Sequence, residues 1–147
     1  MVQIFGNKKK YVDYLVRKGA YAIIFNDSKN KVLAVQTPNG NHFLPGGGIE
    51  NNESDKECLK REMLEETGYQ VAIGSFIGNA MCYFQSTKNE HLLSDGYFYG
   101  AKLLERVKEP VEDDHQVKWV DIENIEGFFI HKHQIWAIKE GLNSRST

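Results

Sequence analysis

Five glutamates are crowded into one short segment of the chain: Glu53, Glu57, Glu62, Glu65 and Glu66. On a helix, positions three and four apart share a face, so the last three carboxylates converge. Each like-charge pair costs about 0.2–0.5 kcal/mol on an exposed helix. Glu65 and Glu66 also fall in the last turn, where the helix dipole disfavours negative charge. The pattern therefore calls for a positive charge on this face.

A bound metal ion is the cation that the residue types favour. Arg61 directly precedes Glu62, so on a helix it is expected to point to a different side. The candidate ligands are all carboxylate oxygens, which suit Mg²⁺, Mn²⁺ or Ca²⁺. The segment lacks the alternating Asp and Asn around a central Gly that a calcium loop needs. We therefore expect Mg²⁺, with Mn²⁺ as a substitute, in a site that also binds substrate phosphates.

Three consecutive glycines, Gly46 to Gly48, follow Pro45 just before the acidic segment. Glycine lets the backbone turn tightly and approach a ligand closely, so a carbonyl of this loop is a candidate to complete the metal shell. No Gly-Lys-Ser/Thr follows, which excludes a P-loop. A plain turn is the alternative interpretation.

The elements that position these groups follow from hydrophobic periodicity and from turn residues. The expected strands are 19–26, 31–36, 42–44, one or two within 69–84 with a break near Gly74, 96–104 and 117–122. The acidic segment predicts a helix over 53–67 that ends at Gly68. A second, amphipathic helix is expected over 131–142. Together they predict an α/β (α+β) fold, with a mixed sheet covered by helices.

The spacing G-x5-E-x7-R-E-U-x-E-E-x-G-U, with U a bulky apolar residue, resembles the Nudix box. In this chain it covers residues 47–69. Tyr69 departs mildly, because the family more often has Ile, Leu or Val there. His42 stands where many members carry Trp, which makes Phe43 beside it a candidate for the aromatic, substrate-binding surface. The box residues of this chain are Gly47, Glu53, Arg61, Glu62, Met63, Glu65, Glu66, Gly68 and Tyr69.

The resemblance implies a fold, a reaction and a set of roles. The fold is an α/β/α sandwich around a mixed sheet, expected as one domain over 1–147 with a frayed tail from about 143. The reaction is Mg²⁺-dependent hydrolysis of a nucleoside diphosphate linked to another group. The implied metal ligands are the Gly46 carbonyl, Glu62, Glu65 and Glu66. Glu62 is also the implied general base, Arg61 orients Glu62 or Glu65, and Glu53 supports the helix start or a water-mediated metal contact.

Weaker signals lie outside the box. The loop 109–116 offers a further acid, with Glu112, Asp113 and Asp114 as candidates. A solvated acidic loop is the alternative, and Asp95 is another candidate acid. Three histidines (His115, His131 and His133) are candidates for contact with base or phosphate, although lone histidines are commonly surface or packing residues. The aromatic residues 83–84, 97–99 and 128–129 are candidates for base stacking or for the core.

Composition excludes several other classes of protein. The chain has 147 residues, a net charge of −2 and a pI of about 6.2, so it carries no basic footprint for nucleic acid. No apolar run approaches the ~20 residues of a membrane helix, and the N-terminus lacks a signal peptide's apolar stretch. Cys58 and Cys82 show no metal-type spacing. These observations predict a cytoplasmic protein with reduced thiols. The resemblance to the Nudix family implies a small nucleotide as its partner.

Three functional hypotheses follow. The leading one is a MutT-like nucleotide pyrophosphohydrolase acting on nucleoside triphosphates, including oxidised ones such as 8-oxo-dGTP, with ADP-ribose and dinucleoside polyphosphates as alternative substrates. The second is a non-catalytic nucleotide-binding sensor module, against which the intact acidic set argues. The third, a structural acidic helix, leaves the electrostatic cost unexplained. An exposed aromatic strand would also support a homodimer.

Overall fold

The computed structural model describes residues 2–110 and 114–143. Two sheets and three helices make up this part of the chain. The strands are β1 (Gln3–Phe5), β2 (Leu15–Ile23), β3 (Lys31–Gln36), β4 (His42–Phe43), β5 (Gly46–Gly48), β6 (Tyr69–Gln85), β7 (His91–Arg106) and β8 (Gln116–Asp121). The helices are α1 (Asp55–Thr67), α2 (Ile125–Phe128) and α3 (Lys132–Asn143), and a short 3-10 turn, η1 (Ile122–Asn124), precedes α2.

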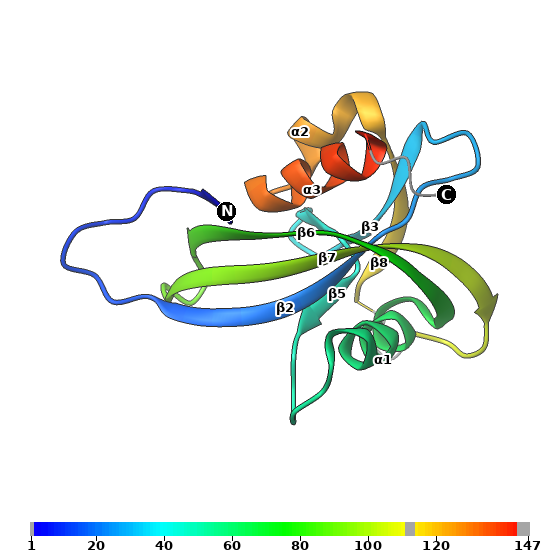
Figure 1. Cartoon of the computed structure of the whole chain (residues 1–147), viewed down its shortest axis with the longest axis horizontal. Helices are drawn as coiled ribbons and strands as arrows, with labels where there is room; N and C mark the ends of the chain where they lie inside the picture. Colours follow the sequence, from blue (N-terminus) through cyan, green and yellow to red (C-terminus); the bar gives the residue numbers. More distant parts are fainter. Residues whose placement is uncertain (1, 111–113, 144–147) are drawn as a thin grey trace.

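The larger sheet has the strand order β1-β6-β7-β2-β5, and the smaller one has the order β4-β3-β8. The larger sheet is mixed, because β1/β6 and β2/β7 pair in parallel whereas β6/β7 and β2/β5 pair antiparallel. Figure 1 shows α1 on one side of this sheet and α2 with α3 on the other. The expected α/β/α arrangement around a mixed sheet is therefore confirmed.

Alternation along β2 divides the apolar core between the two faces. Ala20 and Ala22 pack with Leu59 and Met63 of α1 in one buried cluster. Ile23 faces the other way, into a cluster beneath α2 and α3. Strand β2 therefore anchors both layers.

Local sequence explains where α1 begins and ends. Ser54 is the N-cap, and a capping box with Glu57 satisfies backbone N–H groups at both residues. Gly68 closes the helix in the left-handed conformation, with φ of 76°. Glu53 therefore lies just outside the helix that was expected to begin with it. The last turn of α1 contains no basic residue of its own.

Several other expectations need correction. Gly46 to Gly48 do not form a loop: they form the short strand β5, paired with Gly19 to Tyr21. The expected break near Gly74 is a shift of pairing register within one long strand, β6, between Ile73 and Phe76. Strand β1 was not expected, because three residues carry too little periodicity to be recognised. The predicted tail overlaps α3 at Asn143, and residues 144–147 lie outside the described part.

Among the described residues, no helix is long and apolar enough to cross a membrane. Both cysteines are free and buried.

Candidate active site

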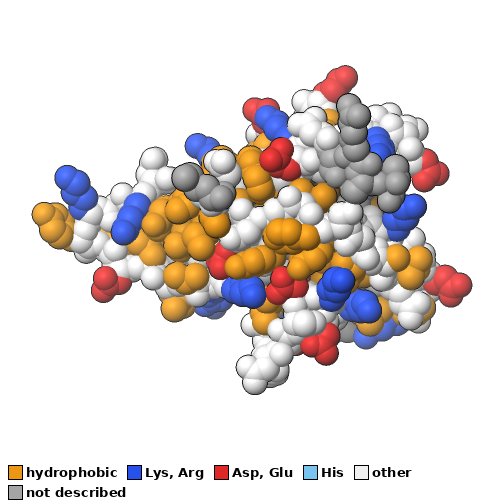
Figure 2. Space-filling view, viewed as in Figure 1, with side chains coloured by type: hydrophobic (Ala, Val, Ile, Leu, Met, Phe, Trp, Pro, Cys, Tyr) orange, Lys and Arg blue, Asp and Glu red, His pale blue; other side chains and the backbone are white. Residues whose placement is uncertain are grey.

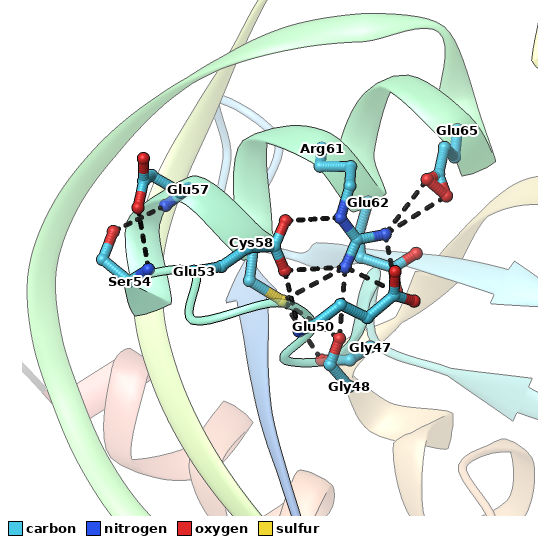
Figure 3. Close-up of polar contacts among 10 residues, drawn as sticks. All are labelled: Gly47, Gly48, Glu50, Glu53, Ser54, Glu57, Cys58, Arg61, Glu62 and Glu65. Atoms are coloured by element: carbon cyan, nitrogen blue, oxygen red, sulfur yellow. Dashed lines mark hydrogen bonds and ion pairs between the residues drawn. The ribbon is translucent and has the colours of Figure 1, made fainter.

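Arg61 is the centre of the acidic cluster (Figure 3). Its guanidinium binds Glu53 in a bidentate manner, with Nε–Oε2 of 2.6 Å and Nη2–Oε1 of 3.0 Å. Nη1 donates to both carboxylate oxygens of Glu65, at 3.0 and 3.2 Å, and Nη2 donates to the Gly48 carbonyl at 3.2 Å. Arg61 Nη1 also lies 3.7 Å from Glu62 Oε2. One arginine therefore joins the helix start, the helix end and strand β5.

The expectation that Arg61 points away from the acidic face is wrong. Adjacent helical positions are separated by about 100°, but a long arginine side chain spans that angle and supplies the positive charge that the carboxylates need. Arg61 and Glu53 each shift the pKa of the other. Hydrogen bonding to Glu53, the largest effect, raises the pKa of Arg61, and hydrogen bonding to Arg61 holds the pKa of Glu53 below its ordinary value.

Glu66 and Glu62 also contact the glycine strand β5. Glu66 is only 8 % exposed, and its Oε1 accepts a hydrogen bond from the Gly46 N–H at 2.9 Å. The Glu62 carboxylate lies against the Cα of Gly47, so closely that a Cβ at position 47 would overlap Glu62 Oε2. Glycine at position 47 is therefore required for the position of Glu62.

We predict that Gly47→Ala displaces the Glu62 carboxylate and lowers kcat. A displacement of about 1 Å at a reacting centre can cost up to about 100-fold, so we expect a loss between about 10- and 100-fold. Gly48→Ala is the matched control, because a Cβ there meets nothing within 4 Å. Steady-state kinetics of the two variants test the prediction, and equal activities would contradict it.

The carboxylates do not all meet at one point. Within residues 2–110 and 114–143, no three His, Cys, Asp or Glu side chains are placed to hold a metal ion together. Glu65 binds Arg61, whereas Glu66 binds Gly46. The predicted convergence of three glutamates is therefore not seen in this conformation. The donors still suit a hard divalent cation, because Glu62 and Glu66 bring carboxylate oxygens to a glycine backbone.

A cleft of about 440 Å³ opens beside this cluster, with Glu66 and Gly46 to Gly48 in its wall. Phe43, Phe84 and His131 line it as well. Their rings are in contact, with centroids of His131 lying 4.6 Å from Phe84 and 5.4 Å from Phe43. Burial lowers the pKa of His131 to about 4, so this imidazole is neutral near pH 7. The wall of the cleft thus combines a carboxylate and a cluster of aromatic rings with two basic residues, Arg17 and Lys18.

The NUDIX domain model of protein families matches residues 16–140 of the chain. The chain belongs to this family. A Bacillus subtilis protein provisionally named an 8-oxo-dGTP diphosphatase is 30 % identical over 129 residues, which cover 84 % of this chain and 80 % of that protein. The suspected family and the class of enzyme, a hydrolase acting on phosphoric anhydrides, are therefore confirmed.

Solved structures show the same Nudix fold. The MutT protein from Methanosarcina mazei Go1 matches with a TM-score of 0.64 at 24 % identity, covering 92 % of this chain and 99 % of its own. An ADP-ribose pyrophosphatase from Streptococcus suis 89-1591 matches with a TM-score of 0.64 at 20 % identity, covering 88 % and 94 %.

The candidate site residues outside the Nudix box lie in different environments. Phe43, His115 and His131 line the cleft, whereas Asp95 is nearly buried and accepts a hydrogen bond from Asn79 at 2.7 Å. Phe98 and Phe129 belong to the core, as the alternative interpretation had it. Glu112 and Asp113 lie outside the described residues.

Sequence reasoning missed several residues of the Nudix cleft, among them Tyr21, Ser94 and Gln134. Tyr21 lies in an apolar strand segment, where nothing separates it from a core residue. Burial raises the pKa of the Tyr21 phenol to about 12, and the nearby carboxylates of Glu66 and Glu62 add to this. Gln134 Oε1 accepts the Leu44 N–H at 2.8 Å and ties α3 to the segment before β5.

Proposed function

We propose that this Nudix hydrolase cleaves a pyrophosphate bond in a nucleoside triphosphate, releasing a monophosphate and pyrophosphate. The observation that carries the proposal is the lining of the cleft. Glu66 and Gly46 to Gly48 line it, together with the rings of Phe43, Phe84 and His131 and the basic residues Arg17 and Lys18. Phosphates suit Glu66 and the glycines when a cation is bound there, and a nucleobase suits the aromatic rings.

Glu62, Glu66 and the Gly46 carbonyl are the groups that we propose to hold a divalent cation, with Glu65 joining them when it leaves Arg61. Mg²⁺ is the proposed ion and Mn²⁺ its substitute. When bound, such an ion offsets charge on phosphate oxygens and lowers the pKa of a bound water. Arg61, held by Glu53, orients Glu65 and the nearby Glu62. Glu62 is the proposed general base, because its carboxylate lies against Gly47 at the edge of the cleft.

The rings of Phe43, Phe84 and His131 are the proposed contacts of the base. Aromatic faces stack on every nucleobase. A neutral imidazole adds a hydrogen-bonding group without attracting a second phosphate. One relative is named an 8-oxo-dGTP diphosphatase and one structural neighbour an ADP-ribose pyrophosphatase, and these names suggest two substrate classes. We favour triphosphates, including oxidised ones. ADP-ribose and dinucleoside polyphosphates are the alternatives.

Product analysis on a nucleotide panel tests the proposal. The panel holds common and 8-oxo triphosphates, ADP-ribose and diadenosine polyphosphates, in Mg²⁺, with Glu62→Gln as control. We expect monophosphate and pyrophosphate from a triphosphate, and none from the control. Cleavage of ADP-ribose alone would move the assignment to that class. Binding without any cleavage would favour the nucleotide-sensing module instead.

A thermal shift tests the metal ligands separately. We expect Mg²⁺ at 100 times its Kd to stabilise the wild-type protein by about 2.7 kcal/mol, because the ion binds only the folded state. The Glu62→Gln/Glu66→Gln protein should lose this shift. Differential scanning fluorimetry measures the Tm of both proteins. An equal rise in Tm on addition of Mg²⁺ would show that the ion binds elsewhere.

The remaining expectations stay predictions. The family match over 16–140 supports one domain over 1–147. A homodimer draws support from exposed apolar side chains, which Figure 2 shows gathered over the extended end of the larger sheet. Ile4, Leu15 and Val16 are each more than half exposed. Sedimentation equilibrium tests the dimer. The absence of a nucleic-acid partner and a cytoplasmic location also remain proposals.

A further inference from the structure

Two consecutive basic residues of β2, Arg17 and Lys18, line the cleft. Successive side chains of a strand point to opposite faces of the sheet. Lys18 lies toward α1, because its Nζ is 3.5 Å from Asp55 Oδ1 and 4.5 Å from the centroid of the Tyr97 ring. Arg17 therefore points to the opposite face, which it shares with Tyr21.

The two side chains differ in what they bind within the protein. The Lys18 ammonium pairs with Asp55 and covers an aromatic ring, so its charge is already matched. The Arg17 guanidinium makes no hydrogen bond, ion pair or ring contact with the residues that the structure describes, and the side chain is exposed. Arg17 therefore brings an unmatched positive charge to the cleft.

Strand pairing places Arg17 beside the end of the glycine strand. Gly19 of β2 pairs with Gly48, and Tyr21 pairs with Gly46. A strand rises by about 3.3 Å per residue, so the Arg17 Cα lies about 7 Å from the first pair and about 13 Å from the second. Arg17 thus borders the glycine strand at the end away from Gly46.

This separation from the proposed cation site has a chemical consequence. Glu66 accepts its hydrogen bond at Gly46, and the Glu62 carboxylate lies against Gly47. An arginine in direct contact with these carboxylates would compete with a metal ion for them. From its place farther along β2, Arg17 leaves the carboxylates to the cation and still reaches a phosphate chain that extends from it.

A nucleoside triphosphate supplies the anion that fits this arrangement. A divalent cation in phosphoryl transfer typically bridges two neighbouring phosphates, so a third phosphate needs another partner. A guanidinium matches two phosphate oxygens with parallel N–H groups. We propose that Arg17 binds the phosphate that the cation does not hold, and thereby favours triphosphates over ADP-ribose, which has only two phosphates. This inference rests on the proposed function for the identity of the substrate.

The edge of a nucleobase is the other acceptor that a guanidinium can match in a bidentate manner. The observations favour the phosphate. The aromatic rings proposed to hold the base, those of Phe43, Phe84 and His131, contact one another, and Arg17 is in contact with none of them among the described residues. A nucleobase is also uncharged, so it would leave the charge of Arg17 unmatched.

Calorimetry with two base-free probes in excess Mg²⁺ tests the contact. The probes are inorganic tripolyphosphate and methylenediphosphonate, a non-hydrolysable analogue with two phosphate-like groups. We expect Arg17→Ala to raise the Kd of tripolyphosphate by about 10- to 100-fold, the usual loss for a hydrogen bond to a charged group. The Kd of methylenediphosphonate should change by less than about threefold. An unchanged Kd for tripolyphosphate, or an equal loss for both probes, overturns the proposal.

Two variants control for charge and for geometry. Lys102→Ala removes an exposed positive charge from β7 at a position that does not line the cleft, and it should leave both Kd values unchanged. Arg17→Lys keeps the charge but loses the planar fork, so its Kd for tripolyphosphate should lie between those of wild type and Arg17→Ala. A loss with Lys102→Ala equal to that with Arg17→Ala would show a general effect of net charge and overturn the contact.

Turnover separates a phosphate contact from a base contact. Arg17→Ala should lower kcat/KM by the same factor for every nucleoside triphosphate that the wild type cleaves, because the phosphate chain is common to all of them. A loss confined to one base would place Arg17 at the base and overturn the proposal.

The outcomes also separate this inference from the proposed function. Turnover of a triphosphate that is equal in wild type and Arg17→Ala overturns the Arg17 contact alone. Tripolyphosphate binding that depends on Arg17, without turnover of any nucleotide triphosphate, keeps the contact and overturns the proposed reaction.

Discussion

Glu62→Gln is expected to lower kcat by about 10²- to 10⁴-fold, the usual contribution of a general base. Glutamine keeps the size and hydrogen-bonding capacity of the side chain but cannot accept a proton from water. Its amide also fits the same space against Gly47, so the fold should be unchanged. Steady-state kinetics on the nucleotide that the panel identifies, with circular dichroism for the fold, measure the effect.

Glu57→Gln is the control on the same helix. Glu57 closes the capping box with Ser54, a role that glutamine also performs. It should keep wild-type activity. If the two variants lose activity equally, general loss of negative charge on α1 is the cause, and Glu62 has no special role.

Arg61→Ala is the second change with a large expected effect. It removes the only basic partner that hydrogen-bonds both Glu53 and Glu65 in the described structure. Buried ion pairs that lose one partner cost about 3–5 kcal/mol. The Arg61 side chain is 26 % exposed, and solvent screens it in part, so we expect about 1–3 kcal/mol. Because Glu62 and Glu65 also lose an orienting partner, kcat should fall by about 100-fold.

The pH dependence of this stability loss has a definite sign. Arg61 holds the pKa of Glu53 below its ordinary value. The stabilisation from the Arg61–Glu53 pair is therefore complete above the unfolded-state pKa of Glu53, about 4.3. It is lost as the pH falls through the lowered pKa of Glu53 in the folded protein. Urea unfolding of the wild type and of Arg61→Ala should show a difference in unfolding free energy near pH 7 that becomes smaller in acid. A difference in unfolding free energy that stays constant to pH 3 would mean that Arg61→Ala destabilises the protein through lost packing and not through lost charge.

Lys60→Ala is the control for Arg61. Lys60 is the preceding residue on α1 and is exposed, with no ion pair among the described contacts. Its removal should change the unfolding free energy by less than about 0.5 kcal/mol. Arg61→Lys should lie between the two, because an ammonium group cannot bind Glu53 and Glu65 with a planar fork.

Local chemistry was enough to predict much of this molecule. The helix α1 was foreseen, with its end at Gly68, because the acidic segment and the glycine that follows it are a local pattern. Strand β3 was foreseen at its observed bounds, although its four central residues are all buried and do not alternate as expected. The box spacing was enough to identify the family, because the nine specified positions of the box all lie within residues 47–69.

Only the tertiary structure decided how the charges are arranged. The sequence placed Arg61 beside Glu62, but the partner that binds it most closely, Glu53, comes from outside the helix. Glycines 46–48 became a strand because β2 supplies their pairing partner from about 27 residues earlier. Tyr21, Ser94 and Gln134 lie far apart in sequence, and each is indistinguishable from a packing residue on its own. They line one cleft because the folded core brings two strands and a helix together, and no local pattern encodes that.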